Sequence, residues 1–330
     1  MKRLRIPILL ITFFLFQSAI AKTQTDYSDS IFHPDSIRAI VEVLAADSLE
    51  GRLTGSEGCL KAAGFIANEF KKAGLKPVAG MDGFFMPFQE NFRNIVGAIK
   101  GNTKPDEIII FSAHYDHVGT KNTNPYPLAG GSGKVRKGDT TYNGANDNAS
   151  GVSAVISLAK YFVKENINER TLIFVAFAGE EQGLLGSEYF ASMINPVPIK
   201  AVINIEMIGR KNDNSGKPFL TGDLFSDLID ILNRRLYEYD AKDYGKRFIE
   251  KDNFANENLF MRSDNYPFAQ MGIPAHTIMV TSPTDKYYHS LSDEVSTLDF
   301  KLVSNIIKAI AISSQGLIKG IDTPSRIKLH

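Results

Sequence analysis

The sequence predicts an α/β protein, folded as a three-layer α/β/α sandwich around a largely parallel sheet. Apolar runs of strand length occur at residues 108–112, 171–177, 201–207 and 273–280. Runs that are continuous rather than alternating are typical of strands buried on both faces. Segments with helical spacing lie between these runs, which favours βαβ connections and a parallel sheet. The 309 residues after position 21 are enough for one large domain, which we place at residues 22–330.

Helical spacing of apolar residues and local stop signals predict the helices. In the first of them Ile37, Ile40, Val41 and Leu44 share one face, and the second is ended by Gly74. The predicted helices cover residues 36–46, 57–73, 151–163, 185–193, 223–239, 263–272 and 298–317. Two further strands, at residues 84–89 and 94–99, are joined by a polar turn. The loop at residues 120–144 is rich in Gly, Asn, Lys and Pro, and a functional loop and a disordered one are equal alternatives for it.

Residues 1–21 have the pattern of a signal peptide. Lys2, Arg3 and Arg5 precede an apolar run at residues 6–16, and Ala19-Ile20-Ala21 is a small-x-small cleavage site. The run is short for a membrane span, and the cleavage site weakens the alternative of a signal anchor. We therefore expect an exported protein, periplasmic or secreted, with no membrane contact beyond this segment. The sequence does not predict the oligomeric state.

The composition argues against some classes of function. Without the three basic residues of the signal segment, the chain has 34 basic and 37 acidic residues, a net charge near −3. A nucleic-acid partner normally needs a clustered basic surface, so none is expected. Cys59 is the only cysteine, which excludes an intramolecular disulfide and a thiolate zinc site.

Potential metal ligands follow the predicted buried strands. His114 and Asp116 come after the first of these strands, the adjacent Glu180 and Glu181 after the second, and Glu206 at the end of the third. In open α/β sheets, ligand sites gather at the carboxyl ends of the strands. Taken alone, Glu180 and Glu181 also fit an ordinary strand end with two solvated acids.

Two more residues would reach the same edge of the sheet. Asp147 lies in a Gly/Asn-rich turn before a helix, and His289 lies in the loop after the last strand. Singly, Asp147 also reads as a helix cap and His289 as an exposed loop residue. Imidazole and carboxylate ligands without thiolate suit a catalytic zinc site. Two His and three carboxylates are enough for a pair of ions about 3.5–4 Å apart, with one carboxylate shared.

The motifs that carry these residues resemble a known family. They are His114-Tyr115-Asp116, GANDNASG at 144–151, GEEQG at 179–183, NIEMIG at 204–209 and Tyr288-His289. In this order they are similar to the zinc-dependent exopeptidase family that contains bacterial leucyl-type aminopeptidases, glutamate carboxypeptidase II and glutaminyl cyclases. The similarity extends over residues 44–317. It implies a mixed, mostly parallel central sheet, a single zinc-peptidase catalytic domain and peptide substrates.

The resemblance also implies a role for each site residue. Asp147 would bridge two zinc ions, His289 and Glu181 would complete one of them, and His114 and Glu206 the other. Glu180 would be the general base. Asp116 would orient the His114 imidazole. Apart from the resemblance, the Tyr288 hydroxyl is a candidate for stabilising the oxyanion by a hydrogen bond. The family usually has Asp at the position of Glu206, and the extra methylene leaves the carboxylate within reach of a metal but in altered geometry.

These observations predict a zinc-dependent aminopeptidase that removes N-terminal residues from peptides. Three alternatives stay open: a glutaminyl cyclase that forms N-terminal pyroglutamate, another metallo-exopeptidase such as a carboxypeptidase or dipeptidase, and a non-catalytic binding homologue. The remaining histidines are not expected to bind metal. His117 is expected in a loop or behind the ligands, His276 in a strand, and His33 and His330 near the chain ends.

Overall fold

A computed structural model describes residues 30–329 apart from residues 79, 125–130 and 283. The predicted signal segment therefore lies outside the described residues. The strands are β1 (Phe85–Gln89), β2 (Phe92–Ile99), β3 (Lys104–His114), β4 (Arg170–Phe177), β5 (Ile199–Glu206), β6 (Phe219–Leu220), β7 (Glu250–Lys251) and β8 (Ala275–Met279). The helices are α2 (Pro34–Leu44), α3 (Glu57–Ala73), α4 (Gly151–Glu165), α5 (Leu185–Ser192), α6 (Leu228–Tyr239), α7 (Ala241–Tyr244), α8 (Tyr266–Gln270), α9 (Phe300–Ser313) and α10 (Gln315–Ile318). Within the described part, no helix has the length and apolar character needed to cross a bilayer.

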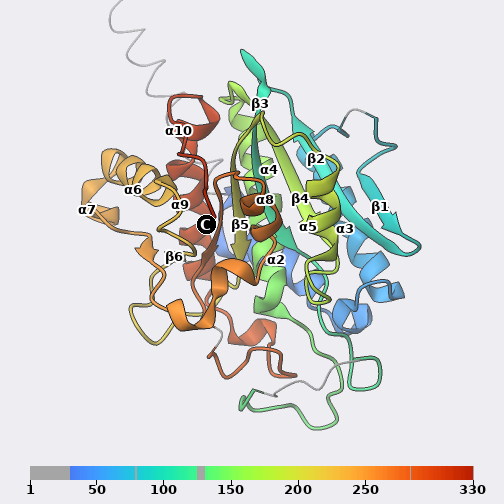
Figure 1. Ribbon diagram of the computed structural model, residues 1–330. Coiled ribbons are helices and arrows are strands. Elements are labelled where there is room, and N and C mark those ends of the chain that lie inside the picture. Colours follow the sequence, from blue (N-terminus) through green and yellow to red (C-terminus); the bar gives the residue numbers. More distant parts are fainter. Residues whose placement is uncertain (1–29, 79, 125–130, 283, 330) are drawn as a thin grey trace, which may run out of the picture.

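One mixed sheet forms the centre of the molecule (Figure 1). Its strand order is β1-β2-β4-β3-β5-β8-β6-β7. The central strands β4, β3, β5 and β8 are parallel, whereas β2 and β6 join them antiparallel. The predicted mixed, mostly parallel sheet is therefore confirmed. Because the four parallel strands run the same way, their carboxyl ends lie at one edge of the sheet.

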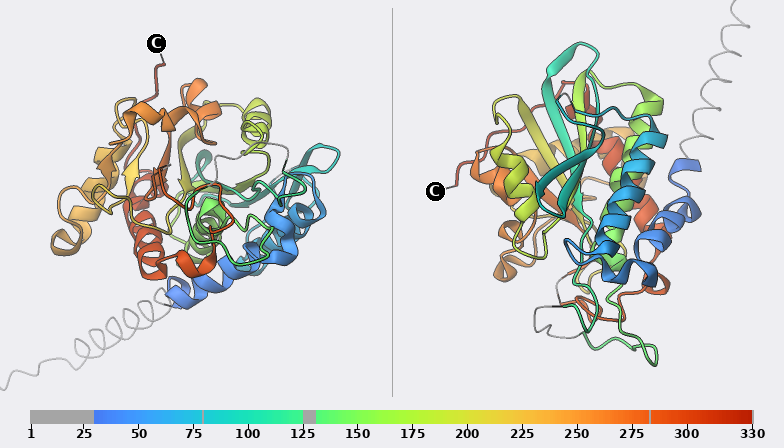
Figure 2. Two further views of the ribbon diagram at one scale, coloured as in Figure 1. Left: turned by 90° about the horizontal axis from the view of Figure 1, so that it is seen from below. Right: turned by 90° about the vertical axis from the view of Figure 1, so that its right-hand side faces the viewer.

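Helices cover both faces of the sheet, as the right-hand view of Figure 2 shows. Alternate residues of β4 face the two helix layers. Phe174 packs with α4 and its neighbours on one face of the sheet, and Val175 and Phe177 pack with α5 and α8 on the other. Every residue of β4 after Thr171 is buried. This explains why the strand is apolar throughout, and it confirms the three-layer sandwich.

Most predicted helices are found, and the local signals explain where they begin and end. The Ser56 hydroxyl accepts a hydrogen bond from the N–H of Cys59 at the start of α3, and Gly74 ends that helix at φ 93°. The predicted helix at 298–317 is interrupted at Ser314, whose hydroxyl donates to the carbonyl of Ile310. A serine that binds back in this way bends a helix.

The helix predicted to begin at residue 223 begins instead at Leu228. Residues before it are held by other elements. The Ser226 hydroxyl contacts Nε2 of His276 on β8, and the Asp227 carboxylate accepts the N–H of Ser325 in the C-terminal segment. These contacts hold the segment outside the helix, and amphipathic spacing alone does not reveal them.

His276 is expected to make stability depend on pH. The imidazole is fully buried on β8, and burial lowers its pKa to about 4. In the unfolded chain the same imidazole takes up a proton near pH 6.5. The contribution of neutral His276 to the free energy of unfolding is therefore fully present above that pH and is lost as the pH falls toward 4. The total loss is about 3 kcal/mol. Urea unfolding of the wild type and His276→Gln, both in chelator, should give a shallower pH dependence for the variant. Equal slopes would contradict the assignment.

Candidate metal centre and active site

The candidate site lies where the parallel strands end. His114 is the last residue of β3 and Glu206 is the last residue of β5. Glu180 and Glu181 lie in the turn after β4, and His289 lies in the loop after β8. Segments far apart in the sequence thus meet at one edge, as the topology requires.

Two groups of side chains at this edge have the arrangement of metal ligands. The first group comprises His117, Asp147, Glu181 and His289, and the second comprises His114, Asp147 and Glu206. In each group one potential ligand atom per residue lies within 4.8 Å of all the others. Asp147 belongs to both groups: its Oδ1 is 3.2 Å from Nε2 of His114, and its Oδ2 is 3.2 Å from Nε2 of His289. The structure therefore brings together all five predicted ligands.

The orientation of the His114 and His289 rings is what a metal ion between the side chains would require. Nε2 of His289 lies 3.0 Å from Oε2 of Glu181, in addition to its contact with Asp147. Nevertheless Nε2 of His289 and Nε2 of His114 make no hydrogen bond within the described structure. Their nitrogens are thus close to carboxylate oxygens without being aligned on them. A cation held among these nitrogens and oxygens would satisfy the groups, and the imidazole–carboxylate set suits zinc.

The electrostatics also favour bound cations. Burial, and then the neighbouring Glu206 and Glu181, raise the pKa of Glu180 well above its usual range. Burial raises the pKa of Asp264 to about 7. For His289, burial opposes the charged form, but the nearby Glu181 and Asp147 outweigh it and raise the pKa to about 10. The site holds more acids than its imidazoles can neutralise, and bound divalent ions would supply the missing positive charge.

The turn that carries Asp147 is fixed by hydrogen bonds from both sides. The N–H groups of Asn146 and Asp147 donate to the Asp293 carboxylate at 3.1 Å. The Asn148 side chain donates to the carbonyl of Ile205 and accepts the N–H of Gly151, so the turn is tied to β5 and to the start of α4. The small and Asn-rich GANDNASG motif is therefore needed for a tightly packed turn as well as for its acid.

A buried arginine holds this turn through hydrogen bonds to its backbone carbonyl oxygens. Arg52 is 1% exposed and donates to the carbonyl oxygens of Tyr115 at 2.8 Å, Asn143 at 2.6 Å and Gly144 at 3.0 Å. It also donates to the carbonyl of Leu44 at the end of α2. One guanidinium thus joins α2, the segment after β3 and the Asp147 turn.

Asp116, the acid expected to orient His114, has hydrogen-bond partners of its own. Asp116 accepts the Thr54 hydroxyl at 2.6 Å and the N–H of Glu180 at 3.3 Å. Nδ1 of His114 is 3.3 Å from the backbone oxygen of Asp116 and 3.8 Å from its carboxylate. Asp116 therefore contacts both the His114 ring and the turn of Glu180.

Glu206, for which the resemblance described above implies Asp, is held by a chain of hydroxyl and amide groups. The Ser263 hydroxyl donates to its Oε2, and that hydroxyl accepts the Asn204 amide at 2.8 Å. Asn204 in turn accepts the Ser112 hydroxyl at 2.8 Å. The longer side chain is thus directed toward His114 and Asp147. Ser263 lies between Arg262 and Asp264, in the segment that precedes α8.

A small cleft opens onto the two ligand groups. Tyr288 lies in its wall, with its ring stacked on His289 at 3.9 Å between centroids and its hydroxyl 3.5 Å from Nη2 of Arg262. The cleft is lined by Asp147, Glu180, Glu181, Glu206, Met207, Leu259, Arg262, Ser263, Met279, Tyr288 and His289. It therefore has an acidic floor and a partly apolar wall.

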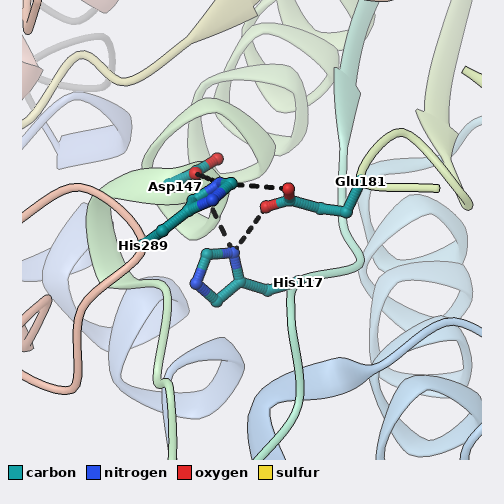
Figure 3. A group of neighbouring side chains, drawn as sticks. All are labelled: His117, Asp147, Glu181 and His289. Carbon is teal, nitrogen blue, oxygen red and sulfur yellow. Dashed lines mark hydrogen bonds and ion pairs between the residues drawn. The ribbon is translucent and has the colours of Figure 1, made fainter. Parts of the chain in front are cut away.

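His117 is a site residue that the ligand prediction did not include. It lies three residues after His114 and faces Asp147, Glu181 and His289 (Figure 3). Its place in the same loop after β3 was the available signal. His276 lies in β8, as predicted. His33 caps the N-terminus of α2, near the start of the described chain. His330 lies outside the described residues.

The family assignment follows from a match to a large part of the chain. Residues 94–313 match the model of peptidase family M28. The chain belongs to this family. The match confirms the resemblance seen in the motifs, and its range includes His114, Asp147, Glu180, Glu181, Glu206 and His289.

Related sequences include proteins named as a zinc metalloprotease and as an aminopeptidase. A probable zinc metalloprotease of Phaeosphaeria nodorum is 38% identical over 281 residues, which cover 74% of this chain and 55% of that protein. Aminopeptidase YwaD of Bacillus subtilis is 24% identical over 246 residues, covering 72% of this M28 chain and 47% of that protein. The chain thus spans about half the length of these two relatives.

Solved structures show the same fold. The LapA aminopeptidase of Legionella pneumophila has a TM-score of 0.66 at 20% identity, covering 89% of this chain and 75% of LapA. BSAP, a zinc aminopeptidase from Bacillus subtilis, has a TM-score of 0.65 at 14% identity, with coverages of 87% and 95%. The glutaminyl cyclase of Porphyromonas gingivalis has a TM-score of 0.63 at 16% identity, with coverages of 87% and 99%. At these identities the likeness concerns the fold.

Proposed function

We propose that this M28 family member is a zinc-dependent aminopeptidase that hydrolyses N-terminal residues from peptides. The observation that carries the proposal is the pair of ligand groups that share Asp147, with Glu180 beside them but in neither group. In this assignment His289 and Glu181 hold one ion with Asp147, and His114 and Glu206 hold the other. Bound zinc supplies a lowered pKa for water and polarisation of the scissile carbonyl.

Glu180 is the general base in this proposal. Glu180 lines the cleft, and burial together with neighbouring acids raises its pKa. A raised pKa lies closer to neutral pH, where a general base must both accept and return a proton. Glu180 accepts the proton of the attacking water and delivers it to the leaving amine. Asp116 holds the Glu180 turn through the Glu180 N–H, and the Tyr288 hydroxyl stabilises the oxyanion.

The carboxylates of the cleft support recognition of an N-terminal amine. Glu180, Glu181 and Glu206 line the cleft, so the N–H groups of an amine find hydrogen-bond acceptors there. A carboxypeptidase needs a basic pocket for a terminal carboxylate. Among the described lining residues Arg262 is the one Arg or Lys, and it is half exposed and paired with Glu257 at 3.8 Å. The acidic floor therefore favours aminopeptidase activity over carboxypeptidase activity.

The wall of the cleft supports an apolar N-terminal side chain. Met207, Leu259 and Met279 line the cleft and pack together as one small apolar cluster. A leucyl side chain placed against them would bury apolar surface, at about 25 cal/mol per Å². We therefore propose leucyl-type substrates.

A panel of aminoacyl anilides and N-terminal glutamine peptides, run with and without a chelator, tests this function. We expect release of the aniline from leucyl anilide, loss of this activity in chelator, and recovery when zinc is returned. N-acetyl-leucyl anilide is the control, because blocking the amine removes the group that the acidic floor binds. Cleavage of the blocked substrate at an equal rate would refute an aminopeptidase.

The same panel separates the rivals. Conversion of N-terminal glutamine to pyroglutamate without release of an amino acid would identify a glutaminyl cyclase, an activity that the fold also accommodates in the Porphyromonas gingivalis enzyme. A purified protein that keeps its fold and binds no metal would instead indicate a binding homologue. Export to the periplasm or beyond stays a proposal based on residues 1–21.

A further inference from the structure

His117 lies against one carboxylate of the candidate metal centre. The imidazole is fully buried, and its Nδ1 is 2.8 Å from Oε1 of Glu181 (Figure 3). The distance from Nδ1 to Oδ2 of Asp147 is longer, at 3.9 Å. His117 thus has one close partner, Glu181, and this partner is itself a proposed ligand.

The aim of the ring distinguishes His117 from the proposed imidazole ligands. Nε2 of His114 and Nε2 of His289 approach carboxylates without hydrogen-bond alignment, whereas Nδ1 of His117 is aligned on Oε1 of Glu181. A nitrogen that points directly at an oxygen is suited to donating a proton to it. A nitrogen that points between oxygens is suited to binding an ion.

The second nitrogen of the ring leads to the same conclusion. Nε2 of His117 is buried and has no hydrogen-bond partner within the described structure. A neutral imidazole carries one proton, and Nδ1 is the nitrogen that has an acceptor for it. If Nδ1 bound a metal, the proton would have to lie on Nε2, where no acceptor is found. Ligating imidazoles almost always donate through the other nitrogen, as His114 can through Nδ1 to the backbone oxygen of Asp116 at 3.3 Å.

The two oxygens of Glu181 then have separate roles. Oε1 accepts the proton of His117, and Oε2 lies 3.0 Å from Nε2 of His289, on the side of the proposed ion. The other ligand group has the same arrangement, because Ser263 donates to Oε2 of Glu206. In each group a neighbour outside the proposed ligand set engages one oxygen of a ligating carboxylate.

The backbone around His117 is built to hold this orientation. The His117 N–H donates to the carbonyl of Arg52 at 3.1 Å. The ring packs on Gly144 so closely that a Cβ at that position would lie 2.6 Å from the ring atoms Cγ and Cδ2. Gly144 also has φ 57°, which disfavours other residues. The imidazole is therefore confined between two fixed segments.

We propose that His117 is a positioning residue, which donates Nδ1–H to Oε1 of Glu181 so that Glu181 binds the ion shared with Asp147 and His289 through Oε2 alone. The inference rests on the proposed zinc site and goes beyond the activity. By occupying one oxygen, His117 prevents Glu181 from binding through both, and a coordination position at that ion is kept for water or substrate.

Three variants test the role of His117. Asn places its Nδ2 where His has Nδ1, so His117→Asn should keep the donor, whereas His117→Ala removes it. We expect the affinity for one of the two zinc ions, measured by competition with a chelating dye, to fall about 10–100-fold in His117→Ala. His117→Asn should remain within a few-fold of the wild type, and His276→Asn is the control for replacing a buried imidazole elsewhere.

Nitrogen-15 NMR of the zinc-loaded full chain adds a readout that a purely structural role would not move. We expect His117 to be the tautomer with a proton on Nδ1, and that proton signal to disappear in both His117 variants. A metal-bound Nδ1, or equal loss of zinc in His117→Asn and His117→Ala, would make His117 a ligand and overturn the proposal. Unchanged zinc affinity in His117→Ala would overturn it as well. These measurements do not use peptide hydrolysis, so a protein with the expected metal behaviour and no peptidase activity would refute the function alone.

Discussion

Replacement of Glu180 by Gln is expected to lower kcat for leucyl anilide by about 10²–10⁴-fold while zinc content stays unchanged. Gln has the shape of Glu but does not accept and return a proton near neutral pH. Glu180 belongs to neither ligand group, so the change removes the base without removing a ligand. Steady-state kinetics and metal analysis of the same preparation measure the two effects together.

Glu188→Gln is the matched control for this prediction. Glu188 is exposed on α5, only a short distance along the chain from the Glu180 turn, and lies outside both ligand groups. The control variant should keep full activity. If Glu180→Gln kept kcat within about tenfold of the wild type, Glu180 would not be the general base. Loss of zinc in this variant would instead place Glu180 among the metal ligands.

The second large effect is expected for Asp147→Asn. Asp147 gives one oxygen to each ligand group, and its pKa is held well below the usual range, because the contacts with His114 and His289 outweigh the effect of burial. An amide keeps one acceptor oxygen but lacks the negative charge and the second acceptor. Loss of a residue that only hydrogen-bonds to a ligand typically weakens metal binding by about 10–100-fold. Because Asp147 is itself a proposed ligand of both ions, we expect both to bind at least about 100-fold more weakly in Asp147→Asn. Peptidase activity at ordinary zinc levels should disappear.

Zinc titration by calorimetry, with metal analysis after dialysis, measures this loss. Asp322→Asn is a suitable control, because Asp322 is also buried but pairs with Arg234 and Arg235 away from the cleft. Loss of one ion with normal binding of the other would show that Asp147 does not bridge. A single-ion site would then replace the shared arrangement.

The sequence predicted which side chains meet at this edge of the sheet, because topology does most of the assembly. Once β3, β4, β5 and β8 are parallel, residues such as His114 and Glu206 at their carboxyl ends have to lie at one edge. Patterns of apolar residues reveal such strands, and motifs mark their ends. The two-residue strands β6 and β7 escaped prediction because two residues carry no periodic pattern.

Other parts of the site depend on three-dimensional contacts that no local pattern encodes. The direction of Nδ1 in His117 is set by Gly144 and the loop at Arg52, which are distant in sequence. The support of Glu206 comes from Ser263 across the sheet edge. Contacts that orient the candidate ligands were therefore harder to predict than the candidate ligands themselves.

The position of Arg52 has a consequence for how the chain can be shortened. The match to the family model begins at residue 94, yet this guanidinium lies outside that range and binds carbonyls on both sides of the metal centre. A fragment cut to residues 94–313 would remove the donor of these carbonyls, at a cost of about 1–3 kcal/mol for each carbonyl that stays buried. The segment between α2 and α3, which carries Arg52, thus supports the sheet edge at which the candidate site lies, and expression of the matched region alone should give a protein that fails to hold zinc.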